Sequence, residues 1–171
     1  CGVLTGKPSV PASPGCAMFR RRNVVQGLEC HIPNRLGLAC GQKGIGPDLL
    51  LYLRACAFYP NVYYLAKTLS HFRGHRDSIT LSNSRHLTSL CYDAAFGWFL
   101  ATSDLPDRDK HILQGLLLIR TFHPAYLRLA HTLNPWRVYA GLFPEHYHCA
   151  NMTLFSPAAL NFIYSRIKRR L

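Results

Sequence analysis

Two groups of histidine and cysteine residues offer ligands for a metal ion. Residues 146–149 (HYHC) place three such side chains within four positions, and Cys30, His31 and Cys40 supply three more. A structural zinc site needs four ligands in tetrahedral geometry, usually as two closely spaced pairs. Neither group contains a C-x2-C pair, so we expect no metal and no other cofactor. Joining the two groups into one zinc site would give the alternative, a small zinc-stabilised domain.

The other motifs with catalytic potential are weaker. His71 and His75 lie four residues apart, but Gly74 would unwind a helix between them, so we expect a solvated pair. Residues 41–48 (GQKGIGPD) are glycine-rich before a helix, as in a phosphate-binding loop, but they lack the G-x4-G-K-[ST] order. The 8 Asp and Glu residues form no pair spaced for acid–base catalysis. We therefore expect that the chain is not an enzyme.

Positive charge is the most one-sided property of the chain. It has 20 Lys and Arg residues against 8 Asp and Glu residues, a net charge of +12 with neutral histidines. This balance suits acidic partners, whether RNA phosphates, anionic lipid headgroups or acidic protein surfaces. Two clusters are expected to make such contacts: Arg20, Arg21 and Arg22 near the start, and Arg166, Lys168, Arg169 and Arg170 at the end. The second cluster also complements the negative end of a helix dipole, which would explain it without any partner.

A low content of charged residues predicts burial against other proteins. Hydrophobic residues make up 49% of the chain and charged residues 16%, against about 25% in a typical soluble domain. No apolar stretch reaches the ~20 residues that a membrane-spanning helix needs. We therefore expect several protein neighbours to cover the chain. The aromatic residues expected in the core or at such interfaces are Trp98, Phe99, Trp136 and Phe162.

The cysteines and the first residues bear on the cellular compartment. The 7 cysteines are odd in number and irregularly spaced, which predicts reduced thiols and a reducing compartment rather than a disulfide framework. The chain begins with Cys1, and its early segments PSVPASPG and FRRR are rich in serine, proline and arginine. These features favour a mitochondrial protein, associated with the inner membrane or in the matrix, after removal of a targeting peptide.

The sequence predicts that the chain divides into an extended arm, residues 1–46, and a helical domain, residues 47–171. The arm is rich in proline and glycine without a sustained period, so we expect a partner to order it. From residue 47, apolar residues recur at helical spacing between signals that start or end helices. They predict about six helices: 47–58, 62–73, 85–101, one that follows the start signal at 103–109 and ends at 121, 125–133, and 156–170. Residues 136–155 are predicted to be irregular.

Two segments repeat the same skeleton 64 residues apart. Residues 58–73 (FYPNVYYLAKTLSHFR) and 122–137 (FHPAYLRLAHTLNPWR) share a Phe-x-Pro start and a Leu-Ala-x-Thr-Leu core. At this offset, residues 43–106 and 107–170 align as two three-helix units. The pattern predicts an all-α fold, an α-solenoid-like array built from a duplicated three-helix unit. Convergence of similarly capped Leu/Ala-rich helices would give the same array without duplication.

Together these features predict a non-catalytic accessory subunit of a large, membrane-associated mitochondrial complex, such as a respiratory-chain complex or the ATP synthase. Its helices would form a scaffold for other subunits, and its basic clusters would face anionic lipid headgroups or acidic subunits. The alternative is a mitochondrial ribosomal or other RNA-binding protein that contacts rRNA through the same clusters. The net charge supports this alternative, whereas the low density of charged residues opposes it.

Overall fold

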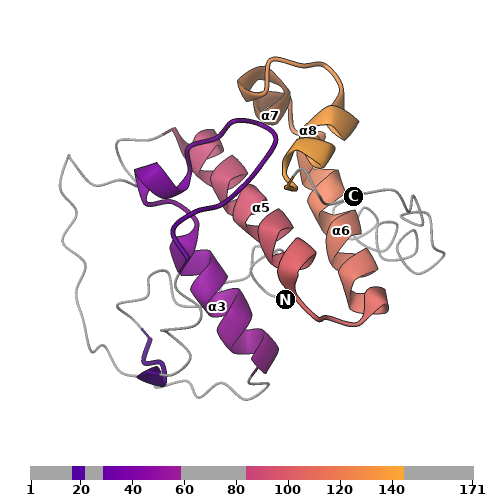
Figure 1. The fold of residues 1–171 in the computed structure, drawn as a ribbon. Coiled ribbons are helices and arrows are strands. Elements are labelled where there is room, and N and C mark those ends of the chain that lie inside the picture. Colours follow the sequence, from indigo (N-terminus) through magenta and orange to yellow (C-terminus); the bar gives the residue numbers. More distant parts are fainter. Residues whose placement is uncertain (1–16, 22–28, 59–83, 145–171) are drawn as a thin grey trace, which may run out of the picture. The chain divides into compact units, whose positions relative to one another are not determined.

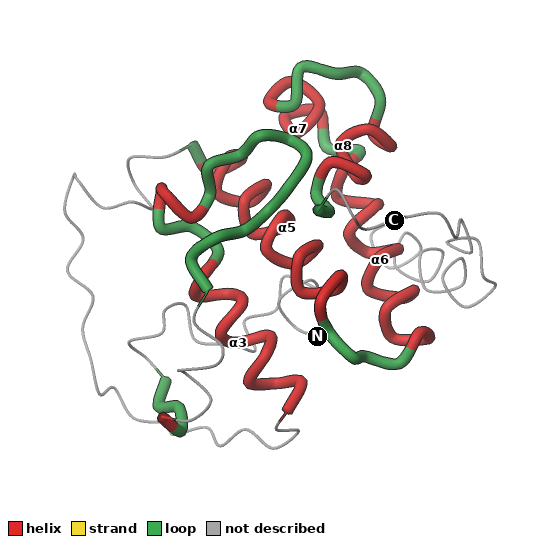
Figure 2. Tube along the Cα trace, in the orientation of Figure 1, coloured by secondary structure: helices red, strands yellow, loops and turns green. Residues whose placement is uncertain are grey.

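The fold is seen in a computed structural model, which describes residues 17–21, 29–58 and 84–144. Within these ranges the chain is helical and contains no strand, which confirms the all-α prediction for this part (Figure 2). The α-helices described are α3 (Pro47–Phe58), α5 (Arg85–Thr102), α6 (Asp107–Thr121), α7 (Pro124–Leu129) and α8 (Pro135–Gly141), with a short 3-10 helix, η2 (Gly41–Lys43), before α3 (Figure 1).

The helices belong to two compact units. Among the described residues, the first unit holds 17–21, 29–32, 39–58 and 84–95, and the second holds 33–38 and 96–144. The first unit therefore contains η2, α3 and the first part of α5, whereas the second contains the rest of α5 together with α6, α7 and α8.

Helices α3, α5 and α6 begin and end close to the predicted residues. Each has residues at its start that cap the first turn or complement the helix dipole. The Asp48 carboxylate accepts a hydrogen bond from the Leu49 backbone N–H at 2.9 Å in the first turn of α3. The Ser84 hydroxyl accepts from the Leu87 N–H at 3.2 Å and caps α5. Helix α6 carries two acidic residues in its first turn, where they complement the helix dipole.

The predictions for residues 125–133 and 136–155 were partly wrong. Helix α7 ends at Leu129, four residues early, and α8 occupies Pro135–Gly141, where irregular structure was predicted. Asn134-Pro135 directly follows the predicted helix end at residue 133 and can stop a helix, but its chemistry serves equally well as a start. The Asn134 side chain accepts from the Trp136 N–H at 2.9 Å, and Pro135 has no N–H that would need an acceptor.

The six-helix array and the duplication are not confirmed. The predicted helices at 62–73 and 156–170 lie outside the described residues, as does nearly all of the first copy of the repeated skeleton, 58–73. The second copy, 122–137, is described, and it forms α7, the connection after it and the start of α8.

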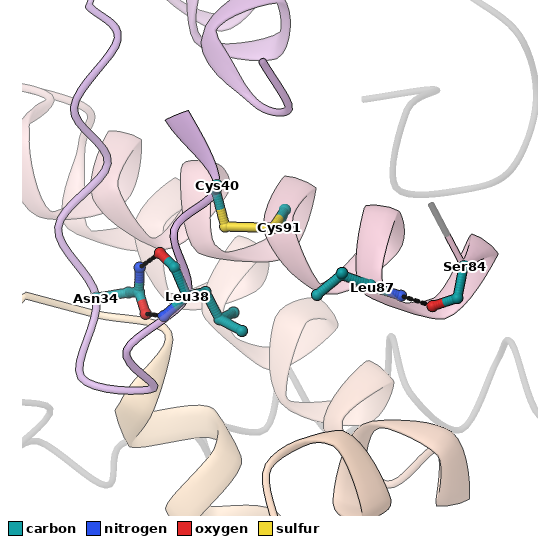
Figure 3. Close-up of a disulfide and its surroundings, with 6 residues drawn as sticks. All are labelled: Asn34, Leu38, Cys40, Ser84, Leu87 and Cys91. Carbon is teal, nitrogen blue, oxygen red and sulfur yellow. Dashed lines mark hydrogen bonds between the residues drawn. A yellow bond between two sulfur atoms is a disulfide. The ribbon is translucent and has the colours of Figure 1, made fainter. Parts of the chain in front are cut away.

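The core of the first unit contains a disulfide between Cys40 and Cys91 (Figure 3). Cys40 immediately precedes η2, Cys91 lies on α5, and each is 1% exposed. The prediction that the cysteines are reduced thiols is therefore wrong for this pair. The two residues are 51 positions apart, and the fold alone brings their Cα atoms to 5.4 Å, so parity and spacing could not reveal the bond.

The glycine-rich entry to α3 serves packing. Gly46 has a positive φ of 110° and is buried, and a Cβ at this position would collide with the Ile32 side chain and lie 3.2 Å from the Ala95 Cβ. A residue with a side chain would need both a rare backbone conformation and space that its neighbours already fill. The resemblance of residues 41–48 to a phosphate-binding loop thus has a structural explanation.

The second unit packs α6 and α7 against α8. Its buried hydrophobic side chains come from the last turns of α5, the middle of α6, one position of α7, and α8 with the residues that follow it; they are Phe96, Phe99, Leu100, Leu116, Leu117, Leu118, Tyr126, Val138, Tyr139, Leu142 and Phe143. The rings of Tyr139 and Phe143 meet edge to face, with their centroids 5.2 Å apart. Backbone hydrogen bonding also ties residues 33–38 to this unit, since the Arg35 N–H donates to the Gly141 carbonyl at 2.8 Å.

Candidate protein-interaction surface

Exposed apolar side chains concentrate in one segment of the second unit. Six large hydrophobic residues are exposed in the described part of the chain, and all but Met18 fall between positions 119 and 136. We call these five the exposed apolar set: Ile119 (41% exposed), Phe122 (54%), Leu129 (36%), Leu133 (93%) and Trp136 (36%). Single exposed apolar residues are normal, but five within so short a segment make it the candidate interaction surface of the described residues.

The end of α6 supplies the first two members. The buried face of this helix carries Leu117 and Thr121, both 0% exposed, and the Thr121 hydroxyl donates to the Leu118 carbonyl at 2.6 Å. Ile119 and Phe122 are three residues apart at the helix end, a spacing that places them on one side. The buried face of α6 packs in the core, and Ile119 and Phe122 remain exposed.

Helix α7 supplies Leu129 and directs the chain toward Leu133. His123 caps its start, with its Nδ1 accepting from the Ala125 N–H at 3.2 Å, and Tyr126 is 4% exposed and anchors the helix. At the other end the Thr132 N–H donates to the Leu127 carbonyl at 3.0 Å.

The turn that ends α7 is a Schellman motif around His131. The His131 N–H donates to the Arg128 carbonyl at 3.1 Å, and His131 adopts the left-handed conformation, φ 48°, that this motif needs. The motif stops the helix and leaves Leu133 almost fully exposed. Burial of such a leucine against an apolar partner is worth roughly 1.5–3 kcal/mol.

Helix α8 holds the last member of the set. The Asn134 side chain caps this helix by accepting from the N–H groups of Trp136 at 2.9 Å and Arg137 at 3.4 Å. Val138 and Tyr139 are buried, 0% and 3% exposed, and fix the helix in the unit. Trp136 precedes them and presents part of its ring to solvent. Because the cap defines the first turn of α8, it also defines where Trp136 lies.

The charge around the exposed apolar set is positive. His123, Arg128, His131 and Arg137 are all exposed, and the sequence has no Asp or Glu between Asp109 and Glu145. The described acidic residues of this unit, Asp104, Asp107 and Asp109, lie at or before the first turn of α6. Asp109, the nearest of them along α6, lies ten positions before Ile119, about 15 Å along the helix. The surface therefore combines apolar side chains with cations that have no acidic residue close by on the same helices.

The residues predicted as contacts lie in different places. Arg20 and Arg21 are exposed in the short described segment 17–21, whereas Arg22 and the four cations Arg166, Lys168, Arg169 and Arg170 lie outside the described residues. Of the predicted aromatics, Phe99 is 4% exposed and belongs to the core, Trp98 is half-buried, and Trp136 belongs to the exposed apolar set. Phe162 lies outside the described residues.

Sequence reasoning did not select Ile119, Phe122, Leu129 or Leu133. Ile119 fits the helical spacing of the apolar residues before it, and the other three fall in the repeated segment 122–137. A usable signal was present for two of them, because Phe122 and Leu133 each lie two residues before a proline that starts a helix. A large apolar residue at such a junction has no helical face that would bury it.

The described residues form no cluster that could hold a metal ion. Within 17–21, 29–58 and 84–144, no three His, Cys, Asp or Glu side chains gather in a group that could hold a metal ion. Cys40 is unavailable as a thiolate ligand because it is in the disulfide, and residues 146–149 lie outside the described ranges.

Tyr92, which donates to the Asp48 carboxylate at 3.1 Å, has its pKa raised to about 12 by burial and, next, by the Asp48 charge and hydrogen bond. No helix in the described part of the chain has the length and apolarity to cross a bilayer.

Comparison with known proteins adds no relative to this picture. No protein-family model matches the chain, and no curated protein or solved structure is similar enough to match it.

Proposed function

We propose that the chain is a non-catalytic structural subunit, a helical scaffold within a large, membrane-associated mitochondrial complex of the respiratory-chain or ATP-synthase kind. The observation that carries this proposal is the exposed apolar set, five large side chains within residues 119–136. The low share of charged residues, 16% of the chain, adds to it because a surface with few charges is better covered by protein than by water.

The disulfide refines the proposed location. Cysteine pairs stay reduced where glutathione and thioredoxin act and persist as disulfides in oxidising environments. Of the two locations expected from the sequence, association with the inner membrane and residence in the matrix, the Cys40–Cys91 bond favours a position where thiols are oxidised during folding. The proposed scaffold also includes the duplicated three-helix unit, 43–106 and 107–170, whose second copy would present the exposed apolar set.

A second candidate function, binding to mitochondrial ribosomal or other RNA, is favoured by the net charge of +12 and by the exposed Arg20 and Arg21. We place it second because RNA-binding surfaces neutralise many phosphates, whereas only 16% of the residues of this chain are charged.

Sedimentation of detergent-solubilised mitochondria, with and without ribonuclease, tests the two functions against each other. The chain is followed by mass spectrometry across the gradient. Under the scaffold proposal it migrates with cytochrome or ATPase activity, and ribonuclease changes nothing. Release from a heavy ribonucleoprotein peak on RNA digestion would overturn the scaffold proposal and support RNA binding.

A further inference from the structure

We propose that the exposed apolar set and the cations around it bind an acidic amphipathic helix of a neighbouring protein. This inference rests on the proposed scaffold function, since it names the chemistry of the partner. The partner would carry apolar residues at helical spacing on one face, flanked by Asp or Glu. The apolar face would cover Ile119, Phe122, Leu129, Leu133 and Trp136, and the acids would meet Arg128 and Arg137.

The composition of the surface favours a protein partner. Interface cores are enriched in aromatic residues and arginine and depleted in lysine and acidic residues. The exposed apolar set follows this pattern, with Trp136 and Phe122 beside leucine and isoleucine, and with arginine as the only basic residue type besides histidine from 119 to 137. In helix-in-groove recognition, an amphipathic helix places its apolar face against a hydrophobic surface of its partner, and the exposed apolar set would supply that surface.

The charges around the exposed apolar set determine whether the partner helix should be acidic or basic. Arg128 and Arg137 are exposed, and the described part of the chain gives neither of them an ion-pair partner. No acidic residue occurs between Asp109 and Glu145 to attract a basic helix. A partner helix with acidic flanks would gain from both arginines, and one with basic flanks would be repelled, so charge decides specificity here.

A membrane surface or a nucleic acid fits these residues less well. Binding in the plane of a membrane uses a continuous amphipathic helix with lysine and arginine along its polar face, whereas α7 has 6 residues and α8 has 7. Single-stranded RNA needs stacking aromatics along a basic groove, and three of the five members of the exposed apolar set are aliphatic.

Binding of three synthetic peptides to the full-length chain tests the proposal. The first peptide is an amphipathic Leu/Glu helix, the second has Lys in place of every Glu, and the third is a scrambled Leu/Glu sequence. Fluorescence anisotropy should show micromolar binding of the Leu/Glu peptide only, weakened by added salt. Equal binding of the Leu/Glu and Leu/Lys peptides, or tighter binding of the chain to phosphatidylglycerol vesicles or to single-stranded RNA than to the Leu/Glu peptide, would overturn the proposal.

Two variants assign the binding to this surface. Leu133→Asp places a charge on a side chain that is 93% exposed, and should weaken binding of the Leu/Glu peptide roughly tenfold or more. Arg128→Glu with Arg137→Glu should reverse the preference toward the Leu/Lys peptide. Met18→Asp, at another exposed apolar residue, and Arg108→Glu, at another exposed arginine, are the matched controls and should change nothing. Equal effects of the controls and the variants would overturn the assignment.

The outcome separates this inference from the scaffold function. If the chain migrates with a mitochondrial complex but shows no peptide preference, the scaffold stands and the acidic-helix partner is wrong. If the Leu/Glu peptide binds with the expected dependence on Leu133, Arg128 and Arg137 but the chain migrates alone, the surface is as proposed and the scaffold function is wrong.

Discussion

Among single residues, Tyr92 has the clearest chemical consequence for stability. Its hydroxyl donates to the Asp48 carboxylate at 3.1 Å, and burial, followed by the charge of Asp48 and this hydrogen bond, raises the pKa of Tyr92 to about 12. Above the pKa of an unfolded tyrosine, about 10, the unfolded chain loses a proton that the folded chain keeps. The stabilising contribution of Tyr92 is therefore complete below about pH 10 and is lost as the pH rises through about 12.

We expect Tyr92→Phe to remove this part of the alkaline loss of stability. At neutral pH it should lower the free energy of unfolding by about 1 kcal/mol, since one hydrogen bond is lost. Urea unfolding at several pH values between 8 and 12 would measure both effects. Asp48→Asn is the companion variant, because it removes the charge but keeps the burial, so the pKa of Tyr92 should fall only part of the way. An unchanged alkaline slope in Tyr92→Phe would show that Tyr92 is not its source.

At the scale of the element, close packing overrides helix propensity at Gly97. This glycine lies within α5, where a Cβ would come 2.6 Å from the Leu142 carbonyl oxygen and 3.1 Å from its carbon. Alanine would favour the helix by about 1 kcal/mol, but the contact is with backbone and cannot move aside cheaply. We therefore expect Gly97→Ala to lower the free energy of unfolding by about 1–3 kcal/mol in urea titrations. Ala101→Gly in the same helix is the control, with a cost from propensity alone of about 1 kcal/mol. Stabilisation by Gly97→Ala would mean that α5 and Leu142 are not so closely packed.

The length of each helix determines how well the sequence could predict it. Helices α3, α5 and α6 are long enough to display a helical period, and Pro47, Ser84 and the acids after Pro106 define their starts. Helices α7 and α8 contain 6 and 7 residues, fewer than two turns each, so no period develops. Asn134-Pro135 can end one helix or begin the next, and only tertiary packing of Val138 and Tyr139 decides between the two.

The candidate surface was harder to predict than the helices for a related reason. A helical pattern assigns every apolar residue to a core, and it contains no information about which face a neighbouring element covers. Trp136 was expected in the core or at an interface, but Ile119 and Leu129 have the same spacing as buried residues and differ from them only in what packs on them. The Schellman motif usually has glycine at the position that His131 occupies. Because the sequence lacks this glycine, the turn before Leu133 could not be predicted.

At the scale of the whole chain, the disulfide is the feature with the largest energetic consequence. It closes a loop of 51 residues, and the chain-entropy model gives a stabilisation of about 4 kcal/mol for a loop of that length. Both sulfur atoms belong to residues that are 1% exposed, so dissolved reductants reach them only when the first unit opens. The bond therefore acts as a covalent brace between the entry to α3 and the middle of α5.

We expect Cys40→Ser with Cys91→Ser to lower the free energy of unfolding by about 4 kcal/mol, and reduction of the native chain to have the same effect. Urea unfolding with and without dithiothreitol measures both. Cys30→Ser and Cys56→Ser are the controls, since both residues are exposed free thiols.

Alkylation of the native chain connects this brace to the compartment. Without reductant, Cys30 and Cys56 should react and Cys40 and Cys91 should not. Cys56 is exposed as a residue, but partial desolvation raises the pKa of its thiol, so its rate of alkylation should continue to increase with pH beyond the range of an ordinary thiol. Rapid alkylation of Cys40 and Cys91 in chain taken directly from cells would show that the pair is reduced there. The first unit would then lack its brace, and the proposed position where thiols are oxidised during folding would be wrong.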